Sequence, residues 1–242
     1  MRYELYYWPT IQGRGEFVRL ALEDAGAAYV DVARSRAKGM GVAAMLRVLE
    51  DAKLAHPPFA PPFLKAGTMW ISQTANILFF LGPRLGLAPA DDAGRLWAHQ
   101  LQLTIADLVA EAHDVHHPIA GSLYYEDQKR EALRAAAYFT RERIPRFLGY
   151  FENVLARNPS GPDHLVGPQA TYVDLSMFQV MAGLNYAFPR AMARAKRKTP
   201  RLVRLAERVA ARPRLAAYLA SPRRLPFNEQ DVFRHYPELD AA

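Results

Sequence analysis

The residues best placed to do chemistry lie in the segment 59–81. Ser72-Gln73-Thr74 opens an apolar helix that we predict from Thr74 to Leu81. The first turn of a helix presents backbone N–H groups without intrahelical partners, together with the positive end of the helix dipole, so it can bind a carboxylate. A Pro61-Pro62 turn precedes this helix and can present its backbone edge to an extended ligand. The segment therefore predicts a receptor for a small anionic peptide.

The elements around this segment alternate between strand and helix over residues 1–83. Hydrophobic periodicity and turn signals predict strands over 3–8, 29–32, 62–65 and 69–71, and helices over 14–25, 43–53 and 74–81. This βαβ-αββα order is typical of a thioredoxin-like domain. A linker over 84–91 follows it.

Residues 92–242 are predicted to be all helical. Start and stop signals place helices from Asp91 or Asp92 to about 113, over 126–156, over 171–188, and in two short segments that begin at Pro200 and Pro213, before an irregular aromatic tail over 227–239. Pro145 removes an N–H within the second helix and should bend it. Thr171 and Asp174 form a capping box, which is a structural feature. We therefore expect an α/β thioredoxin-like N-terminal domain and an all-α C-terminal domain.

Composition narrows the classes of protein and of chemistry. The 242 residues are 50% hydrophobic and 23% charged, as in soluble globular proteins. No apolar run approaches the ~18 residues that span a bilayer, and the N-terminus alternates like a strand rather than a signal peptide, so we expect a cytoplasmic protein without membrane contact. Cysteine is absent, which excludes disulfides, thiolate metal ligands and cysteine nucleophiles. Any thiol chemistry must use a substrate's thiol.

The net charge of +7 raises the question of an acidic partner. Arginine residues cluster between Arg190 and Arg214, on segments predicted as exposed helix. We interpret them as a solvated face. A nucleic-acid surface is the alternative, although no stacking aromatic residues are interspersed there.

Three separated segments resemble the cytosolic glutathione transferases. The matching residues are Leu5–Pro9 with Gly13–Glu16, Pro61-Pro62 with Gln73–Leu78, and Leu165–Gly167 with Thr171–Asp174. They are similar to that family's tyrosine-type first strand and helix, its cis-proline loop with the following helix, and the entry to its buried sixth helix. The resemblance points to the mu/pi/sigma-like branch, in a composition that looks bacterial. It implies a homodimer that needs no cofactor beyond glutathione as co-substrate.

The resemblance implies that Tyr7 stabilises the glutathione thiolate. Lowering a thiol pKa from about 8.5 to about 6.5 requires roughly 2.7 kcal/mol. One hydrogen bond to a charged sulfur supplies ~1.5–3 kcal/mol. Tyr6 and Tyr3 are the alternative donors, and a third possibility is that these strand tyrosines are only core residues.

For glutathione itself, the resemblance implies that Gln73 and Thr74 bind the γ-glutamyl carboxylate. In the plainer interpretation, Ser72 or Thr74 only caps the helix. Arg14 would lie beside the ligand, although the preceding loop is one residue longer than usual in the family. Asp107 would reach across the dimer to the γ-glutamyl amine. A solvated surface aspartate is the other interpretation.

Pro61 is the main departure from the family pattern. The family residue at this position pairs with the cysteinyl backbone of glutathione through both N–H and C=O, but proline has no N–H. The family's tryptophan and lysine for the glycyl carboxylate are also out of register, and Lys53 or Lys38 would have to replace them. Weak glutathione binding or a modified thiol ligand is therefore a second hypothesis.

His113, His116 and His117 have the i, i+3, i+4 spacing that places imidazoles on one helix face. The resemblance implies that His113 and His117 line the pocket for the second substrate. We expect no metal site, because no carboxylate-supported motif accompanies the histidines.

The sequence thus predicts a glutathione transferase that joins the glutathione thiolate to an apolar electrophile. The alternative is a non-catalytic binding or interaction module with the same fold and an altered glutathione site.

Overall fold

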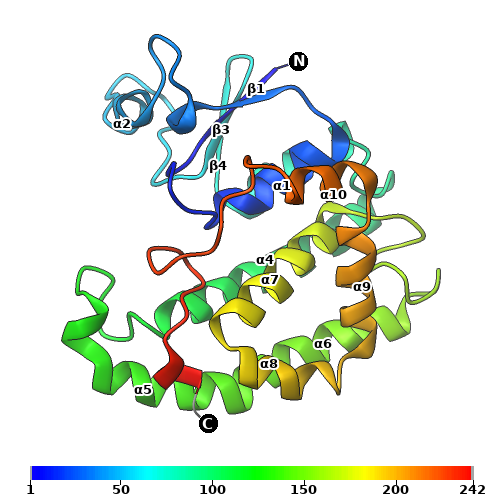
Figure 1. The fold of residues 1–242 in the computed structure, drawn as a ribbon. Coiled ribbons are helices and arrows are strands. Elements are labelled where there is room, and N and C mark those ends of the chain that lie inside the picture. Colours follow the sequence, from blue (N-terminus) through cyan, green and yellow to red (C-terminus); the bar gives the residue numbers. More distant parts are fainter. Residues whose placement is uncertain (1, 241–242) are drawn as a thin grey trace.

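The computed structural model describes residues 2–240 and contains a small mixed sheet above a larger array of helices (Figure 1). The sheet has the strand order β2-β1-β3-β4. Its strands are β1 (Tyr3–Tyr6), β2 (Tyr29–Asp31), β3 (Phe63–Ala66) and β4 (Met69–Ser72). β1 and β2 are parallel, whereas β1 with β3 and β3 with β4 are antiparallel.

Three helices cover the two faces of this sheet: α1 (Gly15–Ala25), α2 (Val42–Leu49) and α3 (Thr74–Arg84). Alternate side chains of β1 point to opposite faces, so Leu5 packs with α1 and α3 while Tyr6 packs with α2. α1 ends at Gly26, whose φ of +64° is accessible to glycine at low cost. α2 ends at Leu49, earlier than the predicted residue 53. Beyond it, the Asp51 side chain accepts a hydrogen bond from the Lys53 N–H (2.9 Å), which favours a local turn over a continued helix.

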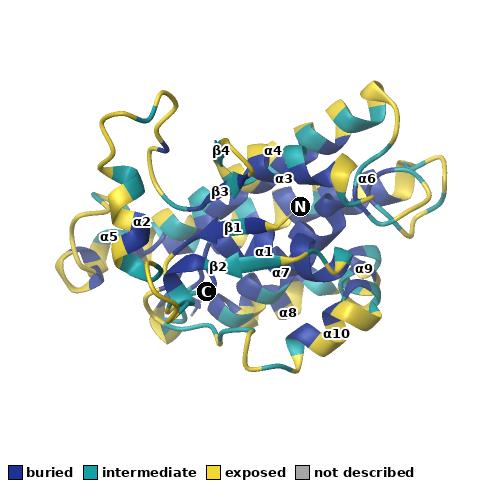
Figure 2. Ribbon diagram, turned by 90° about the horizontal axis from the view of Figure 1, so that it is seen from above, coloured by how far each residue is buried: buried dark blue, intermediate teal, exposed yellow. Residues whose placement is uncertain are grey.

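The helical domain consists of α4 (Asp92–Asp114), α5 (Lys129–Tyr138), α6 (Ile144–Arg157), α7 (Tyr172–Ala187), α8 (Pro189–Lys196), α9 (Pro200–Ala210) and α10 (Pro213–Leu219). α7 lies at its centre and is buried over most of its length (Figure 2). The predicted capping box is present, with the Asp174 carboxylate accepting from the Thr171 N–H at 2.7 Å. The expected fold class, an α/β domain followed by an all-α domain, is confirmed.

The helix predicted over 126–156 is present as an uninterrupted helical stretch, with a distortion close to the predicted bend at Pro145. α5 and α6 are separated by a π-helical turn, Phe139–Arg143. Pro145 lies two residues beyond this turn and has no N–H for the regular hydrogen-bond ladder, which accounts for a distortion at this point. α8 was not predicted as a separate helix.

A buried polar network fixes α1 against the helical domain. The Glu16 carboxylate accepts hydrogen bonds from the hydroxyl of Tyr218 on α10 (2.7 Å) and from the guanidinium of Arg224 (2.6 Å). Arg19 pairs with Glu16 (3.3 Å) and with Asp31 at the end of β2 (2.8 Å). Because these charges are paired and hydrogen-bonded, they fix the orientation of α1 relative to α10.

The C-terminal tail returns from α10 past the start of α1 and then descends along the helical domain, as the red segment of Figure 1 shows. It is irregular until a final 3₁₀ turn, Pro237–Asp240. Tyr236 stacks on Tyr125 with ring centroids 3.9 Å apart, and Asp240 accepts from the N–H groups of Arg190 (2.6 Å) and Ala191 (3.0 Å) at the start of α8. The last residues of the tail are therefore anchored to the helical domain. Over the described part of the chain, no helix combines the length and apolarity that a membrane span needs.

Candidate functional site

A cavity of about 330 Å³ lies where the start of α3 meets α1 and α4. Of the residues predicted to bind glutathione, Arg14, Gln73 and Thr74 line it together. Its other walls are Phe17, Ala75, Asn76, His99, Gln102, Leu103, Ile105, Ala106 and Val109. None of these described residues is acidic, so the cavity presents Arg14 and a helix N-terminus without an opposing carboxylate.

The first turn of α3 offers its N–H groups to this cavity. Gln73 precedes it with φ +68°, an unusual conformation for a residue other than glycine, and its side chain makes no capping hydrogen bond. Thr74 Oγ1 lies 3.5 Å from the Arg14 carbonyl oxygen, so this hydroxyl joins α3 to the residue before α1. This arrangement suits a carboxylate ligand, which accepts the N–H groups and meets the positive end of the helix dipole.

Tyr7 is connected to this cavity by Arg14, which lines the cavity and is hydrogen-bonded to Tyr7. Its hydroxyl oxygen accepts a hydrogen bond from the Arg14 N–H at 2.9 Å, which leaves the phenolic proton for another acceptor. Burial raises the pKa of Tyr7 to about 12, although the Arg14 N–H opposes the rise. The phenol is therefore protonated at neutral pH and acts as a donor, not as a base.

Glycine is required beside the Tyr7 ring. A Cβ atom at Gly13, where φ is +43°, would lie 2.0 Å from the Tyr7 hydroxyl oxygen, and one at Gly15 would lie 2.5 Å from the ring. Tyr6 faces the other way. It stacks on Phe63 with centroids 4.8 Å apart and donates its hydroxyl proton to Glu4 (2.7 Å), which is a packing role.

Asp231, in the tail, holds the loop that carries Arg14. Its carboxylate accepts from the N–H groups of Gln12 (3.1 Å), Gly13 (2.8 Å) and Val232 (2.6 Å), and only 1% of the residue is exposed. Burial raises the pKa of Asp231, whereas these three N–H groups lower it. Sequence reasoning missed this residue because nothing in an irregular tail indicates which distant loop it contacts.

The remaining predicted glutathione residues lie outside the cavity lining. The Pro61-Pro62 bond is cis, and Pro61 is half-buried just before β3. Lys53 and Lys38 are exposed on the loops that flank α2. Asp107 is exposed on α4 and lines a different cavity of about 700 Å³ beside α6. Within one subunit, Asp107 is therefore separate from the Gln73 and Thr74 site.

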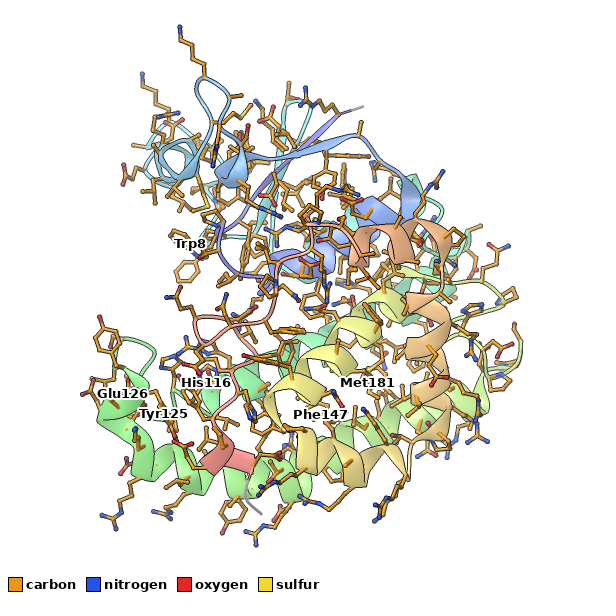
Figure 3. The ribbon with its side chains drawn as sticks, viewed as in Figure 1. Trp8, His116, Tyr125, Glu126, Phe147 and Met181 are labelled. Carbon is orange, nitrogen blue, oxygen red and sulfur yellow. The ribbon has the colours of Figure 1, made fainter. Side chains whose placement is uncertain are left out.

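The three histidines gather at the end of α4, with ring centroids 4.8 to 5.2 Å apart. Buried His116 faces the Val232 carbonyl oxygen (3.0 Å), which ties α4 to the tail. Among residues 2–240, no group of three or more metal-binding side chains could hold an ion. His113 and His117 are half-buried, and Trp8, at the end of β1, lies on the same side of the molecule as His116 and Tyr125 (Figure 3). Trp8 was not among the pocket residues predicted from the sequence, although an aromatic residue next to Tyr7 could have indicated it.

The chain is similar to known glutathione S-transferases. Residues 113–222 match the model of the glutathione S-transferase C-terminal domain. The chain is 26% identical to glutathione S-transferase P of Bos taurus over 224 residues, which cover 91% of this chain and 92% of that protein. It is 21% identical over 193 residues to a glutathione S-transferase of Plasmodium falciparum, covering 78% of this chain and 82% of the relative. A pi-class glutathione S-transferase structure from Onchocerca volvulus superposes with a TM-score of 0.70 at 20% identity, covering 94% of this chain and 98% of that one.

The chain has the glutathione S-transferase fold. Residues 113–222 match the C-terminal domain of that family, and the Onchocerca volvulus neighbour is of the pi class, in line with the mu/pi/sigma-like branch expected from the sequence. None of the relatives named above is bacterial, so they do not support the bacterial origin suggested by composition.

His116 should make the stability of this glutathione S-transferase fold depend on pH. Burial lowers the pKa of His116 to about 3, against about 6.5 in an unfolded chain. Between these values the unfolded state binds more protons, so stability falls as the pH falls below 6.5. Wild type should therefore lose about 2 kcal/mol more than His116→Gln between pH 7 and pH 5, as measured by urea unfolding.

The glutamine introduced by His116→Gln keeps an N–H donor for the Val232 carbonyl oxygen, and His56→Gln, at an exposed position, serves as the control. An identical pH dependence in wild type and His116→Gln would contradict a buried neutral imidazole.

Proposed function

We propose that this protein is a glutathione transferase whose Tyr7 hydroxyl stabilises the glutathione thiolate. The observation that carries the proposal is the continuity between Tyr7 and the cavity. The Tyr7 hydroxyl accepts from the Arg14 N–H at 2.9 Å, and Arg14 shares the cavity wall with Gln73 and Thr74 at the start of α3. A carboxylate bound at α3 would place the rest of an extended tripeptide toward the phenol. The names of the relatives support a transferase enzyme.

In the proposed reaction, the first turn of α3, Gln73, Thr74 and Arg14 bind the γ-glutamyl carboxylate. The thiol loses its proton to solvent, and the Tyr7 O–H donates to the resulting anion. The sulfur lone pair then forms a C–S bond with an electrophilic carbon, whose leaving group departs with its bonding electrons. The phenol contributes ~1.5–3 kcal/mol, comparable to the roughly 2.7 kcal/mol required for two pKa units.

The second substrate is proposed to bind near the end of α4, where His113 and His117 are half-buried beneath the tail. Trp8 is 39% exposed on the same side and offers an apolar wall. This surface suits an apolar electrophile, because burial lowers the pKa of both His113 and His117 and keeps the imidazoles neutral.

We further propose a cytoplasmic, detoxifying homodimer in which Asp107 acts in its partner's site. Asp107 is exposed on α4, together with Leu103, which is 48% exposed, and a surface of this kind is available to a second subunit.

The alternative function is a binding module with an altered glutathione site, and Pro61 favours it. Pro61 has no N–H for the ligand backbone, and Lys53 lies outside the cavity lining. Nucleic-acid binding finds less support. Three cations of the arginine cluster, Arg201, Arg208 and Arg212, pair with Glu152, Asp163 and Asp24.

Calorimetry with glutathione on wild type and Pro61→Ala separates the two functions. Alanine restores a backbone N–H, so we expect glutathione to bind Pro61→Ala more tightly by about 0.5–1.5 kcal/mol. Pro57→Ala, at an exposed position of the same loop, should change nothing. Micromolar to low-millimolar binding by wild type, with conjugation of at least one electrophile in a screen, would support the enzyme. Binding by Pro61→Ala alone would favour the altered site.

A further inference from the structure

The cavity at α3 offers hydrogen-bond donors and a positive charge but no carboxylate among its described lining residues. The start of α3 and Arg14 supply N–H groups, while no acidic side chain stands among the described lining residues. A γ-glutamyl group is a zwitterion at neutral pH, with an ammonium on the same carbon as the carboxylate. A ligand carboxylate at α3 therefore brings a positive charge into a site that has no carboxylate of its own.

Gln102 supplies an acceptor in this cavity. It lies on α4 and lines the cavity, yet only 2% of the residue is exposed. Its Oε1 atom is buried and has no hydrogen-bond partner. A buried amide oxygen without a partner costs free energy, so it is a favourable position for a ligand donor.

We propose that Gln102 accepts a hydrogen bond from the α-ammonium of the γ-glutamyl group, within the subunit whose α3 binds the carboxylate. The inference rests on the proposed function, and it names a specificity-determining residue for that ligand. Rotation about the last side-chain bond can present either end of the Gln102 amide, and the oxygen is the end that lies buried without a partner. Asp107 lines the other cavity of its subunit, so Gln102 is the amine acceptor that the ligand's own subunit supplies.

His99 is the competing acceptor. Its Nδ1 atom is also buried without a partner, and its ring packs on Phe79 with centroids 4.7 Å apart. The His99 side chain is more exposed than that of Gln102. The free-energy cost of leaving the His99 nitrogen without a partner is therefore smaller than that of leaving the Gln102 oxygen unpaired. We therefore assign the ammonium to Gln102 and treat His99 as an outcome of the test.

The test compares two ligands on matched variants by calorimetry. The ligands are glutathione and glutaryl-cysteinyl-glycine, the same peptide with hydrogen in place of the α-amino group. Gln102→Met keeps the length of the side chain and removes the acceptor, and Gln100→Met places the same change at an exposed position of α4 that does not line the cavity. Wild type and Gln100→Met should prefer glutathione by about tenfold or more.

Gln102→Met should lose that preference through weaker glutathione binding, with unchanged affinity for the analogue. Gln102→Glu, which keeps a polar group if the methionine variant folds poorly, should increase the preference. Equal losses for both ligands, or no loss, would overturn the assignment. So would a preference that survives Gln102→Met and disappears in His99→Phe. Wild type that binds neither peptide would overturn the proposed function itself, and the role of Gln102 with it.

Discussion

Replacing Tyr7 by phenylalanine should lower turnover about 10- to 150-fold while glutathione affinity changes little. The phenol donates to a charged sulfur, and such a bond contributes ~1.5–3 kcal/mol. The interaction exists only with the anion, so its loss falls on the reactive form and not on binding of the thiol. The phenylalanine ring keeps the packing against Gly13 and Gly15, so the fold should persist.

Steady-state kinetics at saturating glutathione measure this effect. Tyr6→Phe is the matched control, since the Tyr6 hydroxyl donates to Glu4 on the other face of the sheet. Its turnover should stay within about twofold of wild type, because no contact with the reacting sulfur is lost. An unchanged rate in Tyr7→Phe would remove Tyr7 from the mechanism, and a large loss in Tyr6→Phe would transfer the role to Tyr6.

Replacing Asp231 by alanine should have the largest effect on stability. The Gln12 and Gly13 N–H groups would remain in a buried place without acceptors, and each such group costs about 1–3 kcal/mol. The free energy of unfolding should fall by about 2–5 kcal/mol. Turnover should fall as well, because Gly13 lies against the Tyr7 hydroxyl and Arg14 donates to it.

Urea unfolding and kinetics test this on the same samples. Asp231→Asn retains one carbonyl acceptor and should lose less than the alanine variant. Glu229→Ala, at an exposed position of the tail, should stay within about 0.5 kcal/mol of wild type. An Asp231→Ala protein as stable and active as wild type would show that the tail does not hold the 12–14 loop.

The parts of the fold that depend on local pattern could be predicted from the sequence. Alternation in β1, the glycine stop at residue 26 and the Thr171–Asp174 capping box each arise from residues a few positions apart. The distortion before α6 was predicted as a bend, because Pro145 lacks an N–H, but the sequence does not specify the π-helical turn that accommodates it. Arg14, Gln73 and Thr74 were found through resemblance, and the structure gathers them at one cavity.

The rest of the site depends on long-range contacts that leave no local pattern. Asp231 contacts the loop at Gln12 only because the tail folds back over α1. Gln102 follows Leu101 on the amphipathic helix α4, and the sequence alone does not distinguish a buried glutamine there from an exposed one. The resemblance associates Asp107 with the γ-glutamyl site of a partner subunit, and this stays a prediction. Within its own subunit Asp107 lines a cavity beside α6, which no local pattern indicates.

The most direct test of the central claim is the pKa of the glutathione thiol in the complex, followed by the ultraviolet absorbance of the thiolate as pH is raised. In wild type the bound thiol should ionise near pH 6.5, about two units below the free thiol, and in Tyr7→Phe it should return toward about 8.5. Bound glutathione that ionises near pH 8.5 in both proteins would contradict the account, because Tyr7 would then give the thiolate no stabilisation.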